Sequence, residues 1–418
     1  MVTFEGGELF FIPTSRSNTM LYAPLLRKLF LISDGLAELI SQSGFDSDCD
    51  DINYLKKSLL EGLKRKIVPE PPVDNSDLHL SLELTRDCTL SCIYCHAEAG
   101  RKESMNPELL ETAVEYAFRT SVERNCKSVI VSFVAGGEPT INWPLFRSSV
   151  KKINEAGKKH NLPFRLSITT NGYYNELERK YLVEHFGNIN LSLDGPEDIQ
   201  NKHRPTRDGK KSFPDVIDSG RYFASHSNSF AVRVTVTDYN VRRMEEIISF
   251  FDDELGNKAD VVFEPCFPVG RAREMHLASP PSQELFLVNY LAAKEKGTEL
   301  GIKVTCSSDN TDRVISTYCN SLARPSFVVT TKGIVTACEG DAEGTIYNYG
   351  RFEQGVFRYD ERGVAKIAEL TTTLPEKCNQ CFVKYHCAGD CPTTRITGQD
   401  LCIIRKGIAQ YNLGKILS

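Results

Sequence analysis

Short apolar runs alternate with amphipathic segments along the middle of the chain, at intervals of roughly thirty residues. Runs such as HLSLELT and RLSITTNG predict strands, and the segments between them carry apolar residues at the three- to four-residue spacing of helices. The predicted strands are 79–85, 128–136, 165–172, 189–195, 230–237 and 259–265, and the predicted helices are 107–124, 143–160, 176–186, 213–225, 241–255 and 282–300. This alternation predicts an α/β fold whose parallel sheet curls into a partial (β/α)6 barrel, with reactive residues at the C-terminal ends of its strands.

The two ends of the chain break this pattern. GGELFFIP and NTMLYAP predict two strands, the segments 26–42 and 51–66 predict helices, and IVPEPPVDNSD (67–77) predicts a linker. Beyond residue 301 only two short strands are predicted, near 327–331 and 333–337, in a cysteine-rich region. We therefore expect a small α+β module at 1–75, the barrel core at 76–300 and a cysteine-rich domain at 301–418.

Composition narrows the function classes. The formal net charge of −5 lacks the basic excess of a nucleic-acid binder, so we expect no nucleic-acid partner. No apolar run reaches the ~20 residues of a membrane span, and the N-terminus has no secretory signal, so we expect a cytoplasmic protein without a membrane partner. The chain has 14 cysteines. Because cytoplasmic thiols are kept reduced, grouped cysteines there favour metal binding.

The first cysteine group, C-x3-C-x2-C, consists of Cys88, Cys92 and Cys95 and follows the first predicted barrel strand. Three thiolates on one loop can hold three irons of a [4Fe–4S] cluster and leave the fourth iron open for a substrate or cofactor. The alternative is a structural zinc site, with His96 as the fourth ligand.

This spacing, with Tyr94 before the last cysteine, resembles the radical S-adenosylmethionine (SAM) superfamily over roughly residues 78–300. The resemblance implies that SAM chelates the open iron and is cleaved to a 5′-deoxyadenosyl radical, which abstracts hydrogen from a substrate. It rests also on the family-like motifs GGEP at 136–139 and SLDG at 192–195. By this resemblance the SAM-contacting residues are Tyr94, Gly136, Gly137, Glu138, Asn171, Ser192 and Arg204. Thr170 and Arg233 are weaker candidates.

The second cysteine group resembles the SPASM domain that some radical SAM enzymes carry. The resemblance implies two auxiliary [4Fe–4S] clusters, hence three clusters in the chain. The outer cluster would be held by Cys378, Cys381, Cys387 and Cys402, and the inner one by Cys319, Cys338 and Cys391. Cys306 is the expected fourth ligand of the inner cluster, Cys266 is a weaker candidate, and an iron left open is the remaining option. A zinc ribbon at 378–402 is the alternative.

SPASM-bearing relatives act mainly on polypeptides, either as sulfatase maturases that make formylglycine or as maturases of ribosomally made peptides. The N-terminal module resembles the peptide maturases' recognition element, which binds a leader peptide as an added strand. Sulfatase maturases have an Asp base after the cysteine equivalent to Cys338, whereas this chain has Glu339. Glu339 is therefore the candidate base.

We thus expect a peptide maturase that forms a thioether or carbon–carbon crosslink in a precursor peptide, with a reductant such as flavodoxin or ferredoxin. The first alternative is an anaerobic sulfatase-maturating enzyme. An alternative of another class is a non-catalytic iron–sulfur electron carrier or peptide-binding scaffold, which would not cleave SAM.

Overall fold

The computed structural model describes residues 1–418 except 15–16, 48, 71–75, 320–326, 342 and 418. It divides into two compact units, each built from separate stretches of the chain. Unit 1 comprises residues 1–73, 307–323 and 369–418, and unit 2 comprises 74–306 and 324–368. The expected three-segment division does not coincide with these units, because residues beyond 301 are shared between them. Part of the expected linker, 71–75, lies outside the described residues.

Unit 2 is built on one open sheet of eleven described strands, ordered β11-β10-β9-β8-β7-β6-β5-β12-β13-β14-β15. Its parallel strands follow one another in chain order: β5 (Asp77–Leu82), β6 (Ser128–Phe133), β7 (Phe164–Thr170), β8 (Asn188–Ser192), β9 (Phe230–Val236), β10 (Asp260–Pro265) and β11 (Val304–Thr305). The sheet does not close. The predicted α/β class and partial barrel are confirmed.

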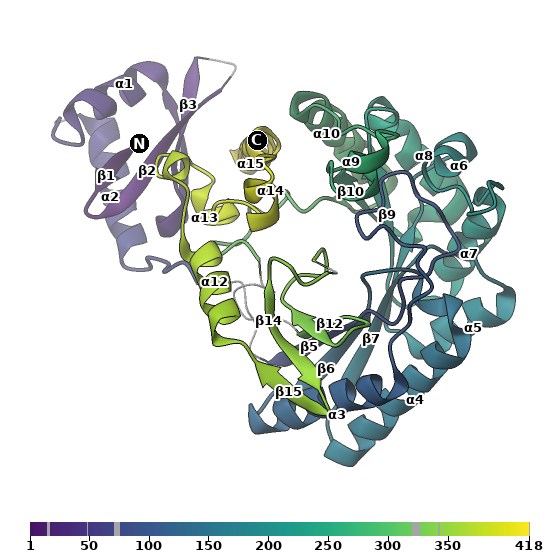
Figure 1. Cartoon of the computed structure of the whole chain (residues 1–418). Helices are drawn as coiled ribbons and strands as arrows, with labels where there is room; N and C mark the ends of the chain where they lie inside the picture. The colour runs from purple at the N-terminus through teal and green to yellow at the C-terminus, as the bar shows by residue number, and fades with distance from the viewer. Residues whose placement is uncertain (15–16, 48, 71–75, 320–326, 342, 418) are drawn as a thin grey trace. The chain divides into compact units, whose positions relative to one another are not determined.

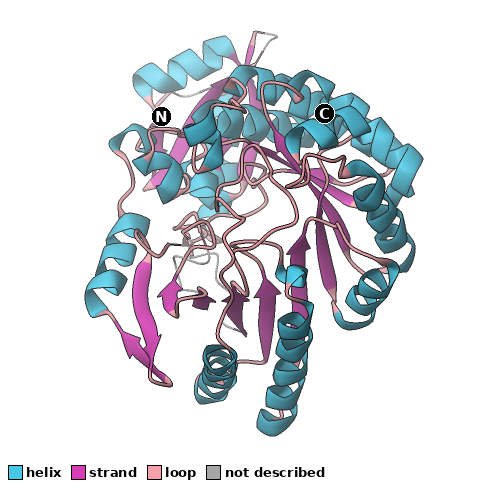
Figure 2. Cartoon of the chain, turned by 45° about the vertical axis from the view of Figure 1, so that its right-hand side comes forward, coloured by secondary structure: helices cyan, strands magenta, loops and turns pink. Residues whose placement is uncertain are grey.

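Helices run along the outer side of these strands (Figure 1, Figure 2). They are α3 (Pro107–Glu123), α4 (Trp143–His160), α5 (Glu176–His185), α6 (Glu197–His203), α7 (Phe213–His226), α8 (Met244–Leu255) and α10 (Gln283–Leu300). The short helix α9 (Arg271–Met275) follows β10. Alternate strand residues point toward this layer: Val129, Val131 and Phe133 of β6 are fully buried. The predicted helices agree closely with these bounds because caps such as Asn106 and Asn142 mark their starts.

Beside β5 the sheet continues with residues from much later in the chain. Strand β12 (Phe327–Val329) pairs parallel to β5, and β13 (Ile334–Thr336), β14 (Asn348–Glu353) and β15 (Val356–Tyr359) continue antiparallel. Only β12 and β13 were predicted. The connection from β13 to β14 contains Cys338 and Glu339, so both belong to the same compact unit as the first cysteine group.

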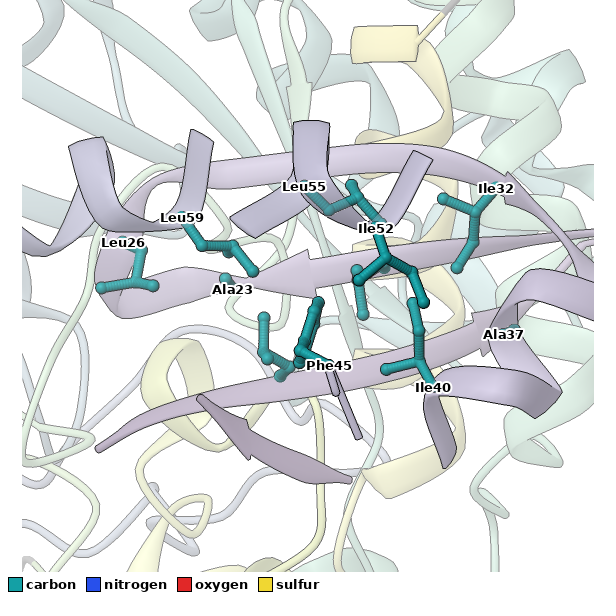
Figure 3. Close-up of a cluster of buried hydrophobic side chains, with 11 residues drawn as sticks. Ala23, Leu26, Ile32, Ala37, Ile40, Phe45, Ile52, Leu55 and Leu59 are labelled. Carbon is teal, nitrogen blue, oxygen red and sulfur yellow. The ribbon is translucent and has the colours of Figure 1, made fainter. Parts of the chain in front are cut away.

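Unit 1 contains a four-stranded antiparallel sheet of β1 (Val2–Phe4), β2 (Gly7–Pro13), β3 (Asn18–Ala23) and β4 (Lys28–Ser33). Helices α1 (Asp34–Ser43) and α2 (Asp50–Leu63) pack against it. Their side chains form the apolar cluster of Figure 3, which includes Ala23, Ile40 and Leu59.

The expected helix at 26–42 is wrong in its first half. Arg27 is in the left-handed region, with φ 52°, and the run Leu29–Ile32 forms β4 instead. Ser33 then caps α1 by accepting a hydrogen bond from the Leu36 backbone N–H. Four consecutive apolar residues fit a strand as well as a helix, and pairing with β3 decides for the strand.

The C-terminal part of unit 1, residues 369–418, is mainly helical and carries the five cysteines from Cys378 to Cys402. It includes α13 (Lys384–Cys387), α14 (Pro392–Ile396) and α15 (Cys402–Leu417), and α12 (Glu361–Thr372) leads into it. Inside this unit the hydroxyl of Tyr22 on β3 lies 2.6 Å from Nε2 of His386 on α13. The described helices include none with the length and hydropathy that crossing a bilayer requires.

Candidate functional site

The first three cysteines lie on the loop that follows β5, at the C-terminal end of the parallel strands. Cys88 is buried, and Cys92 and Cys95 are half-buried. All three contact one apolar cluster with Leu90 and Ala99. The structure therefore brings the predicted thiols together at the edge where the barrel fold places reactive groups.

The GGEP segment supports this loop from the next strand. The backbone N–H of Gly137 donates to the Thr85 carbonyl, and that of Glu138 donates to the Asp87 carbonyl, both at 2.8 Å. A Cβ at Gly137 would lie 1.8 Å from the Asp87 oxygen, so this close approach requires glycine. Gly136 has φ 66°, and a Cβ at this position would lie 2.5 Å from Oε1 of Glu83.

The Glu138 carboxylate is fully engaged with protein donors. It accepts hydrogen bonds from the Thr140 hydroxyl, the Thr170 hydroxyl (both 2.9 Å) and the Asn171 backbone N–H (2.7 Å). It thereby joins the loop after β6 to the loop after β7. Asn171 in turn donates through Nδ2 to the Sγ of Cys88 at 3.6 Å. These contacts give Glu138, Thr170 and Asn171 a structural connection to the cysteine loop, and contact with SAM stays a prediction.

A second brace comes from Gly270 and Arg271, which the sequence did not single out. The Arg271 guanidinium donates to the carbonyls of Cys92 (2.7 Å) and Ala99 (2.6 Å), and its backbone N–H donates to the Cys95 carbonyl. Gly270 has φ 51° and would place a Cβ 2.6 Å from the Cys95 oxygen. In the sequence, the only local feature that could have indicated these contacts is the pair of a glycine and an arginine after the sixth predicted barrel strand.

Arg204 and Tyr94 meet beside the cysteine loop. Arg204 Nη1 lies 3.9 Å from the Cys92 Sγ, and its guanidinium lies 5.2 Å from the centre of the Tyr94 ring. Its Nε is buried and has no hydrogen-bond partner within the described part of the chain. Buried polar atoms are nearly always paired, so this nitrogen marks a place for an acceptor from outside the protein. Ser192, half-buried, ends the neighbouring strand β8.

The inner face of the sheet is polar. In register, Ser81, Ser132 and Ser167 lie side by side on β5, β6 and β7. Farther along, Ser192 pairs with Arg233, an exposed residue of β9 that forms no ion pair with any described residue. These hydroxyl side chains give the inner face hydrogen-bonding groups, which suit a polar substrate better than an apolar one.

Glu339 lies at this inner face. Its Oε1 accepts a hydrogen bond from the Ser81 hydroxyl at 2.8 Å. Burial among protein atoms raises the pKa of Glu339, while the hydrogen bond from Ser81 and the nearby Arg233 charge lower it. Burial of the His96 ring and the positive charge of Arg233 both lower the pKa of His96. Arg233 thus lies close enough to influence both groups. Asp341 lies elsewhere: its carboxylate is occupied by the backbone of residues 345–347.

The four cysteines predicted for the outer auxiliary cluster line one small pocket of unit 1, with Asp390 and Arg405 among its other lining residues. The cysteines are Cys378, Cys381, Cys387 and Cys402. Burial raises the pKa of Cys387 to about 12, so its thiol loses the proton at neutral pH only if a cation compensates. Thiols grouped around one pocket fit an iron–sulfur cluster, in which each thiolate binds its own iron. No three Cys, His, Asp or Glu side chains in the described ranges converge on a single metal ion.

The ligands predicted for the inner cluster are divided between the units. Cys319 and Cys391 belong to unit 1, and Cys338 and Cys306 belong to unit 2. Their assembly into one site stays a prediction. Cys266 is buried after β10 and packs with Tyr94 and Cys92. A cavity of about 800 Å³ lies between α3, α4 and β15, and no predicted site residue lines it.

Comparisons with known proteins bear on the same segment. The model of the Radical SAM superfamily matches residues 82–251. A cysteine-type anaerobic sulfatase-maturating enzyme of Clostridium novyi (strain NT) is 30% identical over 216 residues, which are 48% of this chain and 55% of that relative. The chain spans about half the length of this and several other curated relatives that it matches.

Two solved proteins share the fold. Native anSMEcpe with bound AdoMet and Cp18Cys peptide matches with a TM-score of 0.66 at 22% identity, over 82% of this chain and 98% of that chain. Streptococcus suis SuiB bound to S-adenosylmethionine matches with a TM-score of 0.54 at 14% identity, over 96% of this chain and 98% of that chain. SuiB is also solved bound to precursor peptide SuiA. At these identities the likeness shows the fold alone.

Proposed function

We propose that this chain, whose residues 82–251 match the model of the Radical SAM superfamily, is a radical SAM peptide maturase. It would bind SAM at the cysteine loop and form an intramolecular thioether or carbon–carbon crosslink in a ribosomally made precursor peptide. Bound together, a [4Fe–4S] cluster and SAM would supply a 5′-deoxyadenosyl radical that abstracts hydrogen from the peptide. The observation that carries this proposal is the buried Arg204 guanidinium, whose Nη1 lies 3.9 Å from the Cys92 sulfur and whose Nε has no described partner.

The residues around the loop fit SAM. Cys88, Cys92 and Cys95 would hold three irons and leave the fourth open. Arg204 would pair through its free Nε with the SAM carboxylate, a charge-assisted contact worth roughly twice a neutral hydrogen bond. Glu138 would hold the loops after β6 and β7 in place through its contacts with Thr140, Thr170 and Asn171. Gly136, Gly137, Ser192, Asn171 and Tyr94 are proposed to line the SAM pocket.

A peptide substrate is supported by the related proteins. The Clostridium novyi relative is named a sulfatase-maturating enzyme, and anSMEcpe and SuiB are solved with peptides. The polar inner face, with its serine row, provides hydrogen-bonding groups for a peptide backbone. The open sheet of residues 2–33 in unit 1 has two edges, and a leader peptide would pair with one of them as an added strand.

Glu339 is the proposed base of this reaction. Its carboxylate lies at the inner face and is oriented by the Ser81 hydroxyl, which donates to Oε1. Crosslink formation removes two hydrogens and is a net oxidation. The cysteines of the two auxiliary sites would hold the acceptor for the released electron. These are Cys378, Cys381, Cys387 and Cys402 for the outer cluster and Cys319, Cys338 and Cys391 for the inner, with Cys306 as its fourth ligand. Formylglycine formation on a sulfatase stays the second candidate, because the sulfatase-maturating relatives match this chain.

The first experiment uses anaerobically reconstituted protein with SAM and dithionite. The expected result is 5′-deoxyadenosine from the parent chain and from the Cys126→Ala variant, a buried cysteine outside both groups. Replacing Cys88, Cys92 and Cys95 with Ala should abolish it. About twelve irons per chain would support three clusters, whereas about four would contradict the auxiliary assignment. No 5′-deoxyadenosine from the parent chain would contradict the enzyme proposal.

The second experiment identifies the substrate. A short peptide encoded next to this chain is incubated with the active protein and SAM, and mass spectrometry follows the loss of two hydrogens. Glu339→Gln should leave SAM cleavage in place and slow peptide modification, and Glu353→Gln, a carboxylate on the exposed side of β14, is the matched control. Oxidation of a sulfatase peptide to formylglycine, with no change in the neighbouring peptide, would favour the second candidate.

A further inference from the structure

Asp194 is a fully buried carboxylate on the loop after β8, and it connects four elements around the cysteine loop. Its Oδ1 accepts hydrogen bonds from Arg204 Nη2 (3.0 Å) and from the Thr235 backbone N–H (2.9 Å). Its Oδ2 accepts from the Tyr94 hydroxyl and from His203 Nδ1 (3.0 Å). No acceptor position is left over, so the carboxylate faces protein on every side.

His203 extends this network away from the cysteines. An ionised carboxylate only accepts, so the proton of the His203 ring lies on Nδ1. Nε2 then lies 3.1 Å from the hydroxyl of Thr237, whose backbone N–H donates to Asn240. Asp194 itself is fixed by Gln200, which accepts a hydrogen bond from its backbone N–H at 2.9 Å. The carboxylate therefore has one orientation, and two of its donors belong to or contact the cysteine loop: Tyr94 lies on it, and the His203 carbonyl accepts the Ile93 N–H at 2.9 Å.

The three nitrogens of the Arg204 guanidinium have different surroundings. Nη2 donates to Asp194, Nη1 points to the Cys92 sulfur at 3.9 Å, and Nε is buried without a described partner. The planar guanidinium fixes these three directions relative to one another. An acceptor at Nε would thus be held at a defined position relative to the Cys92 sulfur, and Asp194 sets that position.

Both members of the pair are charged. Burial alone would raise the pKa of Asp194, but the Arg204 charge and the hydrogen bond from His203 hold it well below its usual range. Removing one partner of such a buried pair leaves the other uncompensated, which is costly. Asp194 therefore determines both where the Arg204 charge lies and how much of it is neutralised.

We propose that Asp194 is a positioning residue that couples SAM binding to the iron–sulfur cluster through Arg204. By holding one guanidinium edge, it aims Nε at the SAM carboxylate and Nη1 at the sulfur of Cys92. An N–H···S contact stabilises the reduced, more negative form of a cluster, so Arg204 raises the reduction potential. This inference rests on the SAM-binding part of the proposed function and is independent of the peptide substrate.

SAM affinity tests the positioning role. Equilibrium dialysis of SAM is carried out on the reconstituted, oxidised protein, without turnover. We expect Arg204→Gln to weaken SAM binding by about a hundredfold and Asp194→Asn by about tenfold, as for truncated buried charge pairs. The double variant should bind like Arg204→Gln alone, within about twofold, because the positioning role of Asp194 acts on SAM through Arg204. Full additivity of the two effects would overturn the proposal.

Asp198→Asn is the matched control. Asp198 also accepts hydrogen bonds from an arginine and a tyrosine, Arg243 and Tyr239, but it lies exposed on α6. Its variant should bind SAM like the parent chain. If Asp194→Asn fails to fold, as judged by circular dichroism and iron content, the SAM affinity of Arg204→Lys is measured instead. It retains the charge without the planar fork, and parent-like SAM binding by this variant would overturn the proposal.

The reduction potential tests the contact with the cluster. Anaerobic potentiometric titration, monitored on the electron paramagnetic resonance signal that SAM perturbs, should give a lower midpoint for Arg204→Gln than for the parent chain. Arg204→Lys should lie between them. Equal midpoints for all three would overturn the coupling. If SAM binds and these shifts appear while no peptide is modified, the peptide assignment fails and this inference stands.

Discussion

Gly137 is the position where one added methyl group should most directly disturb the cysteine loop. In Gly137→Ala the new Cβ would start 1.8 Å from the Asp87 carbonyl oxygen, 2.6 Å from its carbon and 2.8 Å from the Arg86 carbon. All three are backbone atoms, so no side chain can rotate away. Ordinary contact begins at 3.4 Å, so the two backbones must separate by about 1.6 Å.

That displacement has an estimable cost. The hydrogen bonds from the Gly137 and Glu138 N–H groups to residues 85 and 87 would be lost, at about 0.5–1.5 kcal/mol each. Overpacking adds about 1–3 kcal/mol, giving about 2–6 kcal/mol in total. A domain of this size has roughly 5–15 kcal/mol of stability, so over most of that range it should stay folded. Because the displaced segment leads directly into Cys88, the cysteine loop should move instead.

Iron content and the SAM-dependent paramagnetic signal measure this effect. We expect Gly137→Ala to lose the SAM-binding cluster and 5′-deoxyadenosine formation while retaining the circular dichroism of the parent chain. Gly187→Ala is the control, because its Cβ would meet only an ordinary 3.8 Å contact and its φ is not positive. A Gly137→Ala protein with full iron content and parent-like SAM cleavage would refute the steric argument.

Three further predictions follow from other contacts. Burial raises the pKa of Glu83 to about 7, so the folded state binds an extra proton between about pH 4.5 and 7. The free energy of unfolding should therefore fall by about 3 kcal/mol as the pH rises through that window. In anaerobic denaturant titrations, the free energy of unfolding of Glu83→Gln should change less with pH than that of the parent chain. Arg271→Ala should increase the rate at which a chelator removes the cluster, measured as loss of cluster absorbance, because the Cys92 carbonyl loses its hydrogen-bond donor. An unchanged rate would argue against a stabilising role of Arg271 at the cysteine loop. Tyr22→Phe removes the contact with His386 and should lower the stability of unit 1 by about 1 kcal/mol in thermal unfolding, with SAM cleavage unchanged.

Local patterns in the chain were enough to predict most elements of unit 2. Alternating buried positions, as in Val129, Val131 and Phe133, mark strands regardless of what lies beside them. Caps such as Asn142 mark helix starts through hydrogen bonds that span only a few residues. The two cysteine groups were also visible, because ligand spacing within a loop is a local property.

Where the pattern was ambiguous, pairing between distant segments decided the structure. The apolar run Leu29–Ile32 is compatible with a helix, and only its pairing with β3 makes it a strand. Strand β12 joins the sheet beside β5 although about 245 residues separate them, so residues after 301 enter unit 2. Nothing in the local sequence encodes such a partner.

The site divides in the same way. The sequence indicated Tyr94, Arg204 and the three cysteines, because each belongs to a recognisable motif. It did not indicate that Asp194 would accept hydrogen bonds from both Tyr94 and Arg204, or that Arg271 would hold the cysteine loop from 179 positions away. Hydrogen bonds and charge pairs act over a few ångströms in space, and residues distant in the chain reach that range only after the sheet has formed.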